Sequence, residues 1–180
     1  IGPVQIEVGA RHDQSSIDSD AIDALPDRLT SRDFKTNHFS GGLRWNLSDQ
    51  LHLKLGIDRS QRAPSAEELY SNGLHVATSN IEIGDDALSP ETAQRAELGI
   101  GWRNERVRVE ASAWVARYAD YMHLSPLLEL EDDGHLHPIS EDGMPIQVWN
   151  QGDARFHGVE IESELTLFDT DRGHLDVRVF

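Results

Sequence analysis

The sequence predicts an all-β chain that forms part of an antiparallel transmembrane β-barrel, with short periplasmic turns and long extracellular loops. Three observations predict it: apolar and polar residues alternate along most of the chain, short turns alternate with long polar segments, and aromatic residues lie beside the short turns. Successive side chains of a strand point to opposite faces of the sheet. Each alternating segment therefore has one apolar and one polar face.

The alternation is carried by about seven segments, each a candidate strand. They cover residues 4–11, 39–47, 51–58, 96–102, 107–115, 159–165 and 175–179. A helix would need apolar residues three and four positions apart, and these segments lack that spacing. The polar positions form a predicted lumen-facing set: Gln5, Glu7, Arg11, Arg44, Lys54, Asp58, Arg95, Glu97, Arg108, Glu110, Glu160, Glu162 and Glu164.

The connections between these segments favour a barrel over a soluble sheet. Short turns are expected at 48–50, 103–106 and 168–173, and long polar segments at 14–32, 60–91 and 119–146. Compact soluble domains rarely carry several loops longer than about 12–15 residues, whereas outer-membrane barrels do. Aromatic residues beside the short turns are typical of a girdle at the lower membrane interface. They are Trp45, Trp102 and Phe168.

Composition excludes several classes of function. The chain has 180 residues and a net charge of −16, which argues against nucleic acid as a partner and against adsorption to an anionic leaflet. The absence of cysteine excludes disulfides, Cys-ligated zinc and thiol catalysis. No Gly-rich phosphate loop, His-Glu-x-x-His or Gly-x-Ser-x-Gly motif occurs. We therefore predict no enzyme and no covalently bound cofactor.

The two ends of the chain look like cuts through a longer protein. It opens at Ile1-Gly2-Pro3 without a basic-then-apolar leader, and it stops at Phe180 within an alternating segment. We expect a parent protein that extends beyond both ends.

Two segments carry distinctive motifs: Arg62-Ala63-Pro64 precedes Glu68-Leu69-Tyr70 and, further on, Glu97-Leu98-Gly99, and Gly158-Val159-Glu160 lies in the second. These segments resemble the TonB-dependent outer-membrane receptors. In that family a strand ends in Arg-x-Pro before a Glu-Leu-aromatic loop, and later strands carry Glu-Leu-Gly and Gly-x-Glu. Asp85 stands where the family usually has Asn. The matching residues are Arg62, Pro64, Glu67, Leu69, Asn72, Gly73, Gly84, Leu88, Glu91 and Glu97 in the first region, and Gly158 and Glu160 in the second.

The resemblance implies a protein of the Gram-negative outer membrane with an N-terminal plug and a roughly 22-stranded barrel. Residues 1–180 would form part of one barrel domain, without the plug. Implied partners are membrane lipid and the TonB–ExbB–ExbD energy-coupling complex, reached through the missing plug region. Residues 71–78 most resemble the zinc-uptake branch of the family.

Histidines in acidic loops are the candidate metal ligands. His135 and His137 lie two positions apart beside Asp132 and Asp133, a combination that suits zinc or another divalent metal as the transported ligand. The alternative is a solvated acidic loop tip. His75 would face the vestibule or, alternatively, hold its own loop by a hydrogen bond.

The motif residues have expected structural roles. Arg62, Pro64 and Glu67 are expected to organise the loop, with a short helix within 64–70. Gly158 would allow a kink or a close approach by a neighbour.

The sequence leaves three functional hypotheses. The first is uptake of a scarce nutrient, a metal ion such as zinc or a metal complex such as a siderophore. The second is a soluble β-sandwich module for binding or adhesion with acidic loops. The third is a β-rich hydrolase that uses two carboxylates, such as Glu67 and Glu68.

Overall fold

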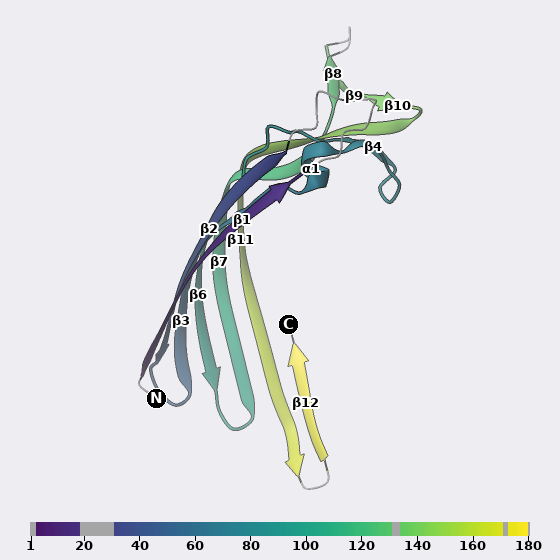
Figure 1. Ribbon diagram of the computed structural model, residues 1–180. Helices are drawn as coiled ribbons and strands as arrows, with labels where there is room; N and C mark the ends of the chain where they lie inside the picture. The colour runs from purple at the N-terminus through teal and green to yellow at the C-terminus, as the bar shows by residue number, and fades with distance from the viewer. Residues whose placement is uncertain (1–2, 19–30, 131–133, 171–172, 180) are drawn as a thin grey trace.

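The computed structural model describes residues 3–18, 31–130, 134–170 and 173–179, and its main feature is one large antiparallel sheet (Figure 1). Its long strands pair in chain order, and in the described residues the sheet stays open between its first and last strands. The predicted set of about seven strands is confirmed. They are β1 (Val4–Ile17), β2 (Arg32–Asn46), β3 (Leu51–Arg62), β6 (Glu91–Arg103), β7 (Val107–Pro126), β11 (Met144–Thr170) and β12 (Gly173–Val179).

Shorter elements gather at the end of the sheet opposite the tight turns (Figure 1). The β3–β6 connection contains α1 (Ala66–Tyr70), β4 (Asn72–His75) and β5 (Asn80–Ile83). β5 pairs in parallel with the beginning of β11. The β7–β11 connection contains β8 (Leu128–Leu130), β9 (Leu136–Pro138) and β10 (Ser140–Glu141). No helix in the described part of the chain is long and apolar enough to cross a membrane.

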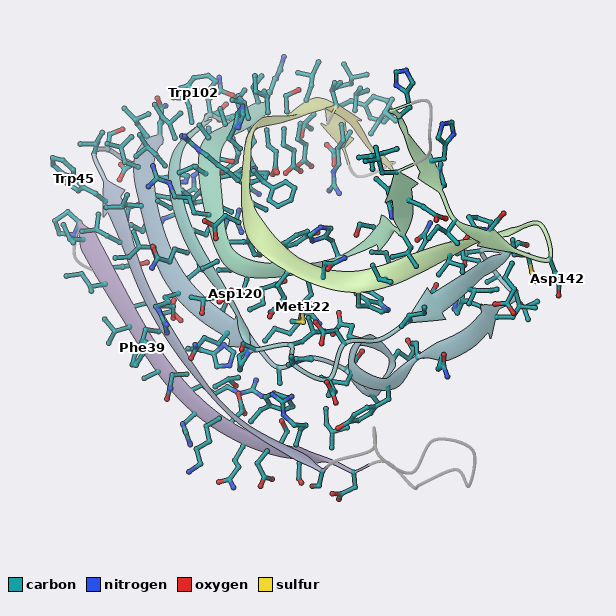
Figure 2. The ribbon with its side chains drawn as sticks, turned by 90° about the horizontal axis from the view of Figure 1, so that it is seen from above. Phe39, Trp45, Trp102, Asp120, Met122 and Asp142 are labelled. Atoms are coloured by element: carbon teal, nitrogen blue, oxygen red, sulfur yellow. The ribbon has the colours of Figure 1, made fainter. Side chains whose placement is uncertain are left out.

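Strand register sorts the side chains into an apolar and a polar face. One register row runs Ile6, Leu43, Leu55, Leu98, Ala113 and Val159 across six strands. The adjacent row on the other face runs Gln5, Arg44, Lys54, Gly99, Ser112 and Glu160. Trp45 and Trp102 lie on the convex side of the curved sheet (Figure 2), which is therefore the apolar outer face.

The apolar face is exposed rather than covered by protein. Among the described residues, five apolar side chains besides Pro64 are buried, whereas twenty-five large ones are exposed. Val8 is 81% exposed, Leu98 59% and Ile161 60%. An exposed apolar surface of this extent marks a membrane or partner contact. The described residues place no second sheet against this face, so the β-sandwich alternative is wrong.

The tight turns at 48–50 and 103–106 follow the prediction, and side-chain hydrogen bonds explain them. The expected bounds 168–173 were too wide, because β11 continues to Thr170, which pairs with Gly173 of β12. The Ser48 hydroxyl accepts hydrogen bonds from the backbone N–H groups of Gln50 and Leu51. The side-chain amide oxygen of Asn104 accepts hydrogen bonds from the backbone N–H groups of Arg106 and Val107. Such side-chain to backbone bonds favour turns.

The long polar segments contain more strand than expected. β1 continues to Ile17, and β2 begins at Arg32. β7 continues to Pro126, and β11 already begins at Met144. The expected loop bounds 14–32 and 119–146 were therefore too wide. Above the bilayer both faces meet polar surroundings, so the backbone ladder continues while the apolar alternation fades.

Candidate functional site at the extracellular end of the strands

The segment 62–91, which we call the clasp, begins with a capped helix. Ser65 is the N-cap of α1: its hydroxyl accepts a bond from the Glu68 N–H at 3.2 Å. The Glu68 carboxylate in turn accepts from the Ser65 N–H at 2.7 Å, which completes a capping box. The preceding Pro64 is fully buried. The predicted short helix is thereby confirmed.

An ion-pair network ties the clasp to the barrel wall. The Arg62 guanidinium lies 2.8 Å from the Glu68 carboxylate and 3.5 Å from that of Glu91. Glu91 also accepts a hydrogen bond from the Met122 N–H at 2.9 Å. Burial raises the pKa of Glu68, but hydrogen bonds from Arg62 and Ser65 outweigh it and hold that pKa below its ordinary value. The network therefore joins β3, α1, β6 and β7.

Sequence reasoning selected Glu67, whereas its neighbour Glu68 is the carboxylate that binds Arg62. The Glu67 side chain is exposed, and its backbone carbonyl accepts a hydrogen bond from the Ser71 N–H. Two adjacent carboxylates are indistinguishable in the sequence, and the phase of the helix decides which one faces Arg62.

A small apolar core lies under the clasp. Leu69 and Leu88 are 2% and 1% exposed, and they pack with Phe34 and Met122. The backbone of Leu69 approaches Gly84 so closely that a Cβ there would lie 2.5 Å from the Leu69 carbonyl carbon. Gly84 is therefore required by the fit of the clasp against itself.

The remaining motif residues lie in the strands. Asn72 and Gly73 of β4 pair with β5, opposite Ile83 and Glu82. The Glu97 carboxylate binds Arg95 on the inner face. The Trp114 ring lies where a Cβ on Gly158 would be, at 2.9 Å, which is the close approach expected there. The Trp114 indole N–H donates to Glu160 at 3.1 Å.

Aromatic rings gather on the inner face near the clasp, and we call Tyr118, Tyr121, His123 and Phe156 the aromatic ledge. The ring centroids of Phe156 lie 5.5 Å from Tyr118 and 5.6 Å from Tyr121. The His123 ring stacks on Tyr121 at 6.2 Å. Phe156 lies on the same face of β11 as Gly158 and Glu160, the two residues that contact Trp114, because all three occupy alternate positions of one strand. Glu160 belongs to the polar inner row, so the ledge faces the lumen.

The ledge was missed because strand alternation is interrupted within it. The β7–β11 register shifts between the Tyr118–Ala154 and Tyr121–Gly152 pairs. Asp120, at φ 58°, takes the left-handed conformation in this bulge (Figure 2). The extra residue places Tyr118 and Tyr121, three positions apart, on one face. Their unusual spacing was the available signal.

The predicted metal ligands are only partly described. The Nδ1 atom of His75 lies 2.9 Å from the Thr78 hydroxyl and 3.6 Å from the Glu82 carboxylate. His137 stands opposite Glu129 in the β8–β9 hairpin. Asp132 and Asp133 lie outside the described residues. Within the described ranges, no group of three or more His, Cys, Asp or Glu side chains is placed to hold a metal ion. The metal site stays a prediction.

Comparisons with known proteins match this geometry to one family. The family model described as "TonB dependent receptor-like, beta-barrel" matches residues 1–178. A probable hemoglobin and hemoglobin-haptoglobin-binding protein 1 of Haemophilus influenzae is 27% identical over 143 residues, covering 78% of this chain and 13% of the relative. The hemoglobin and hemoglobin-haptoglobin-binding protein B of Haemophilus influenzae is 28% identical over 145 residues, covering 78% of this chain.

Solved structures share the fold at lower identity. The copper transporter OprC superposes with a TM-score of 0.69 at 19% identity, covering 93% of this chain and 24% of that one. The Serratia marcescens hemophore receptor HasR gives a TM-score of 0.56 at 14% identity, covering 89% and 27%. The narrower resemblance to zinc-uptake receptors stays a prediction.

The strand register, the exposed apolar face and the family match all indicate the wall of an outer-membrane barrel. The chain spans only 13–15% of the length of the two Haemophilus influenzae relatives and of the hemoglobin and hemoglobin-haptoglobin-binding protein A of the same organism. The match to the family model covers almost the whole chain. The chain therefore belongs to the TonB-dependent receptor-like β-barrel family of the Gram-negative outer membrane.

Proposed function

We propose that the parent protein takes up a planar metal chelate of the heme class across the outer membrane. The aromatic ledge is the observation that carries this proposal. Uptake is driven by the TonB–ExbB–ExbD complex acting through a plug domain outside this chain. The described residues form part of the barrel wall and of its extracellular vestibule, and they perform no covalent chemistry.

The chemistry of the ledge suits a flat conjugated ligand. Tyr118, Tyr121 and Phe156 offer ring edges and faces, and aromatic pairs prefer such offset or edge-to-face contacts. His123 adds an imidazole, the commonest metal ligand among side chains. A bare cation would instead need several convergent ligating groups. Two Haemophilus relatives are hemoglobin-binding proteins, and the HasR structure is a complex with a hemophore and heme, which also supports a heme-class ligand.

Hemin titration of the full-length receptor tests this proposal. The Tyr121→Ala/Phe156→Ala variant should bind hemin at least about tenfold more weakly, because each ring contact contributes on the order of 1 kcal/mol. Phe39→Leu, which removes an aromatic ring from the outer face, is the matched control and should bind like the parent. Equal hemin affinity in the ledge variant and the parent would refute the proposal.

A second candidate ligand is a divalent cation, captured by the β8–β9 hairpin. His137 stands directly opposite Glu129, and such cross-strand partners have neighbouring side chains. The acidic chain would also concentrate cations near its surface.

Zinc titration tests this second candidate. His135→Ala/His137→Ala should weaken zinc binding by the full receptor, whereas His157→Ala, a histidine of the barrel wall, should not. Unchanged zinc affinity in the double variant removes this candidate, and it leaves the hemin proposal untouched.

A further inference from the structure

A row of arginines crosses the outer, lipid-facing side of the sheet. Arg59 of β3 pairs in register with Gln94 of β6, which pairs with Arg117 of β7, which pairs with Arg155 of β11. We call Arg59, Arg117 and Arg155 the arginine row. It shares its face with the apolar rows that contain Ile57, Leu98 and Val159, because all occupy alternate positions of the same strands.

The height of the row matches the upper membrane interface. Trp102 of the lower girdle and Gln94 of the row are eight residues apart on β6. Eight residues span roughly 27 Å of strand, and a strand tilt of about 40° reduces this to roughly 21 Å of height. That is close to the ~25 Å apolar band of outer-membrane barrels. Charged residues on the lipid face cost most at the midplane and little near the interfaces.

Within the described ranges, the arginine row has no carboxylate partner for its positive charge. On the inner face and in the clasp, Arg95, Arg108 and Arg62 each bind a carboxylate. Among the described residues, no member of the arginine row forms an ion pair or a side-chain hydrogen bond. Asp153 lines a hollow with Arg117 and Arg155 without pairing with either. This local excess of positive charge contrasts with the net charge of −16 of the whole chain.

A groove on the same face begins beneath the row. It has a volume of about 590 Å³, and Arg59 and Arg117 line it together with Phe39, Gly41, Ile57, Ala96 and Val115. The small Ala96 stands in register between the larger Ile57 and Val115, and the small Gly41 stands on the other side of Ile57, so the surface is hollowed on both sides of Ile57. A second hollow of about 380 Å³ shares Gln94 and Arg117 with the groove and reaches Arg155. An apolar floor thus lies directly below clustered guanidinium groups.

We propose that this outer face binds a phosphate-bearing lipid of the outer leaflet, with an acyl chain in the groove and its phosphate at the arginine row. Guanidinium groups bind phosphate oxygens in a bidentate geometry, and three of them match a headgroup with more than one phosphate. Clustered arginines near a membrane surface attract anionic lipid. The proposal rests on family membership and register, and it is independent of the nutrient that the receptor takes up.

Native mass spectrometry and thermal melting of the full-length receptor in detergent test the proposal. The parent, Arg59→Gln/Arg117→Gln and the control Arg103→Gln/Arg106→Gln are compared; both variants remove two positive charges, but the control does so at the periplasmic turn. Each is titrated with bisphosphorylated lipid A, with the same lipid lacking phosphates, and with inorganic phosphate. Arg155→Gln, added to the first variant, extends the series.

Bisphosphorylated lipid A should raise the melting temperature of the parent and of the control, and it should remain bound in the mass spectrum. Binding to Arg59→Gln/Arg117→Gln should be roughly 30-fold weaker, and weaker again with Arg155→Gln. Equal binding of the phosphorylated and phosphate-free lipids would overturn the proposal. So would equal lipid A affinity in all variants, or full stabilisation of the parent by inorganic phosphate alone.

Discussion

Replacement of Glu68 separates the two roles of its carboxylate in the clasp, which are to cap the helix and to form an ion pair with Arg62. Glu68→Gln keeps an oxygen that accepts from the Ser65 N–H, but it loses the ion pair with Arg62 at 2.8 Å. Glu68 is 6% exposed, whereas the Arg62 side chain is 47% exposed, so water screens the pair partly. We expect a loss of about 1.5 kcal/mol for Gln. Loss of the cap in Glu68→Ala adds about 1 kcal/mol.

Hydrogen–deuterium exchange of the full receptor measures these losses in the clasp. The N–H groups of Leu69, Ser71, Gly84 and Asp85 are hydrogen-bonded within the clasp and report its opening. They should exchange about tenfold faster in Glu68→Gln and roughly 60-fold faster in Glu68→Ala. The control Glu67→Gln changes an exposed neighbour and should exchange like the parent. Identical protection in Glu68→Ala and the parent, or equal loss in the control, would refute this assignment.

Three further outcomes follow from the same contacts. Gly84→Ala places a Cβ 2.5 Å from the Leu69 backbone, so limited proteolysis should cut the clasp faster by at least tenfold. Gly158→Ala drives a Cβ into the Trp114 ring and should lower stability by about 1–2 kcal/mol in thermal melting. The folded pKa of Glu68 lies below its ordinary 4.5, so its contribution is complete above pH 4.5 and is lost as pH falls through the folded value. The protection factors of the clasp N–H groups, corrected for the slower intrinsic exchange in acid, should therefore fall with pH in the parent, and this fall should be smaller in Glu68→Gln.

The barrel wall could be predicted from sequence because the two faces of each strand meet different solvents. Leu98 meets lipid and its neighbour Glu97 meets the lumen, so hydropathy reports the strand and its orientation directly. The tight turns were predictable because Asn and Ser at their start bond to the backbone of the next residues.

The extracellular end could not be predicted to the same depth. The parallel pairing of Ile81 with Ile146 joins residues far apart in the chain, and no local pattern encodes it. The bulge at Asp120 reverses the face of the residues after it, which hid the aromatic ledge. The choice of Glu68 over Glu67 depends on helix phase, which is set by the cap at Ser65.

Lipid-phase quenching of labels on adjacent residues tests most directly whether the apolar face meets the bilayer. Leu98→Cys and Glu97→Cys would each carry a fluorophore in the full receptor reconstituted with brominated lipids; this chain contains no cysteine of its own. We predict strong quenching by the lipids at position 98 and weak quenching at 97, with the reverse order for a water-soluble quencher. Equal quenching at both positions, or stronger lipid quenching at 97, would contradict a barrel wall built on this register.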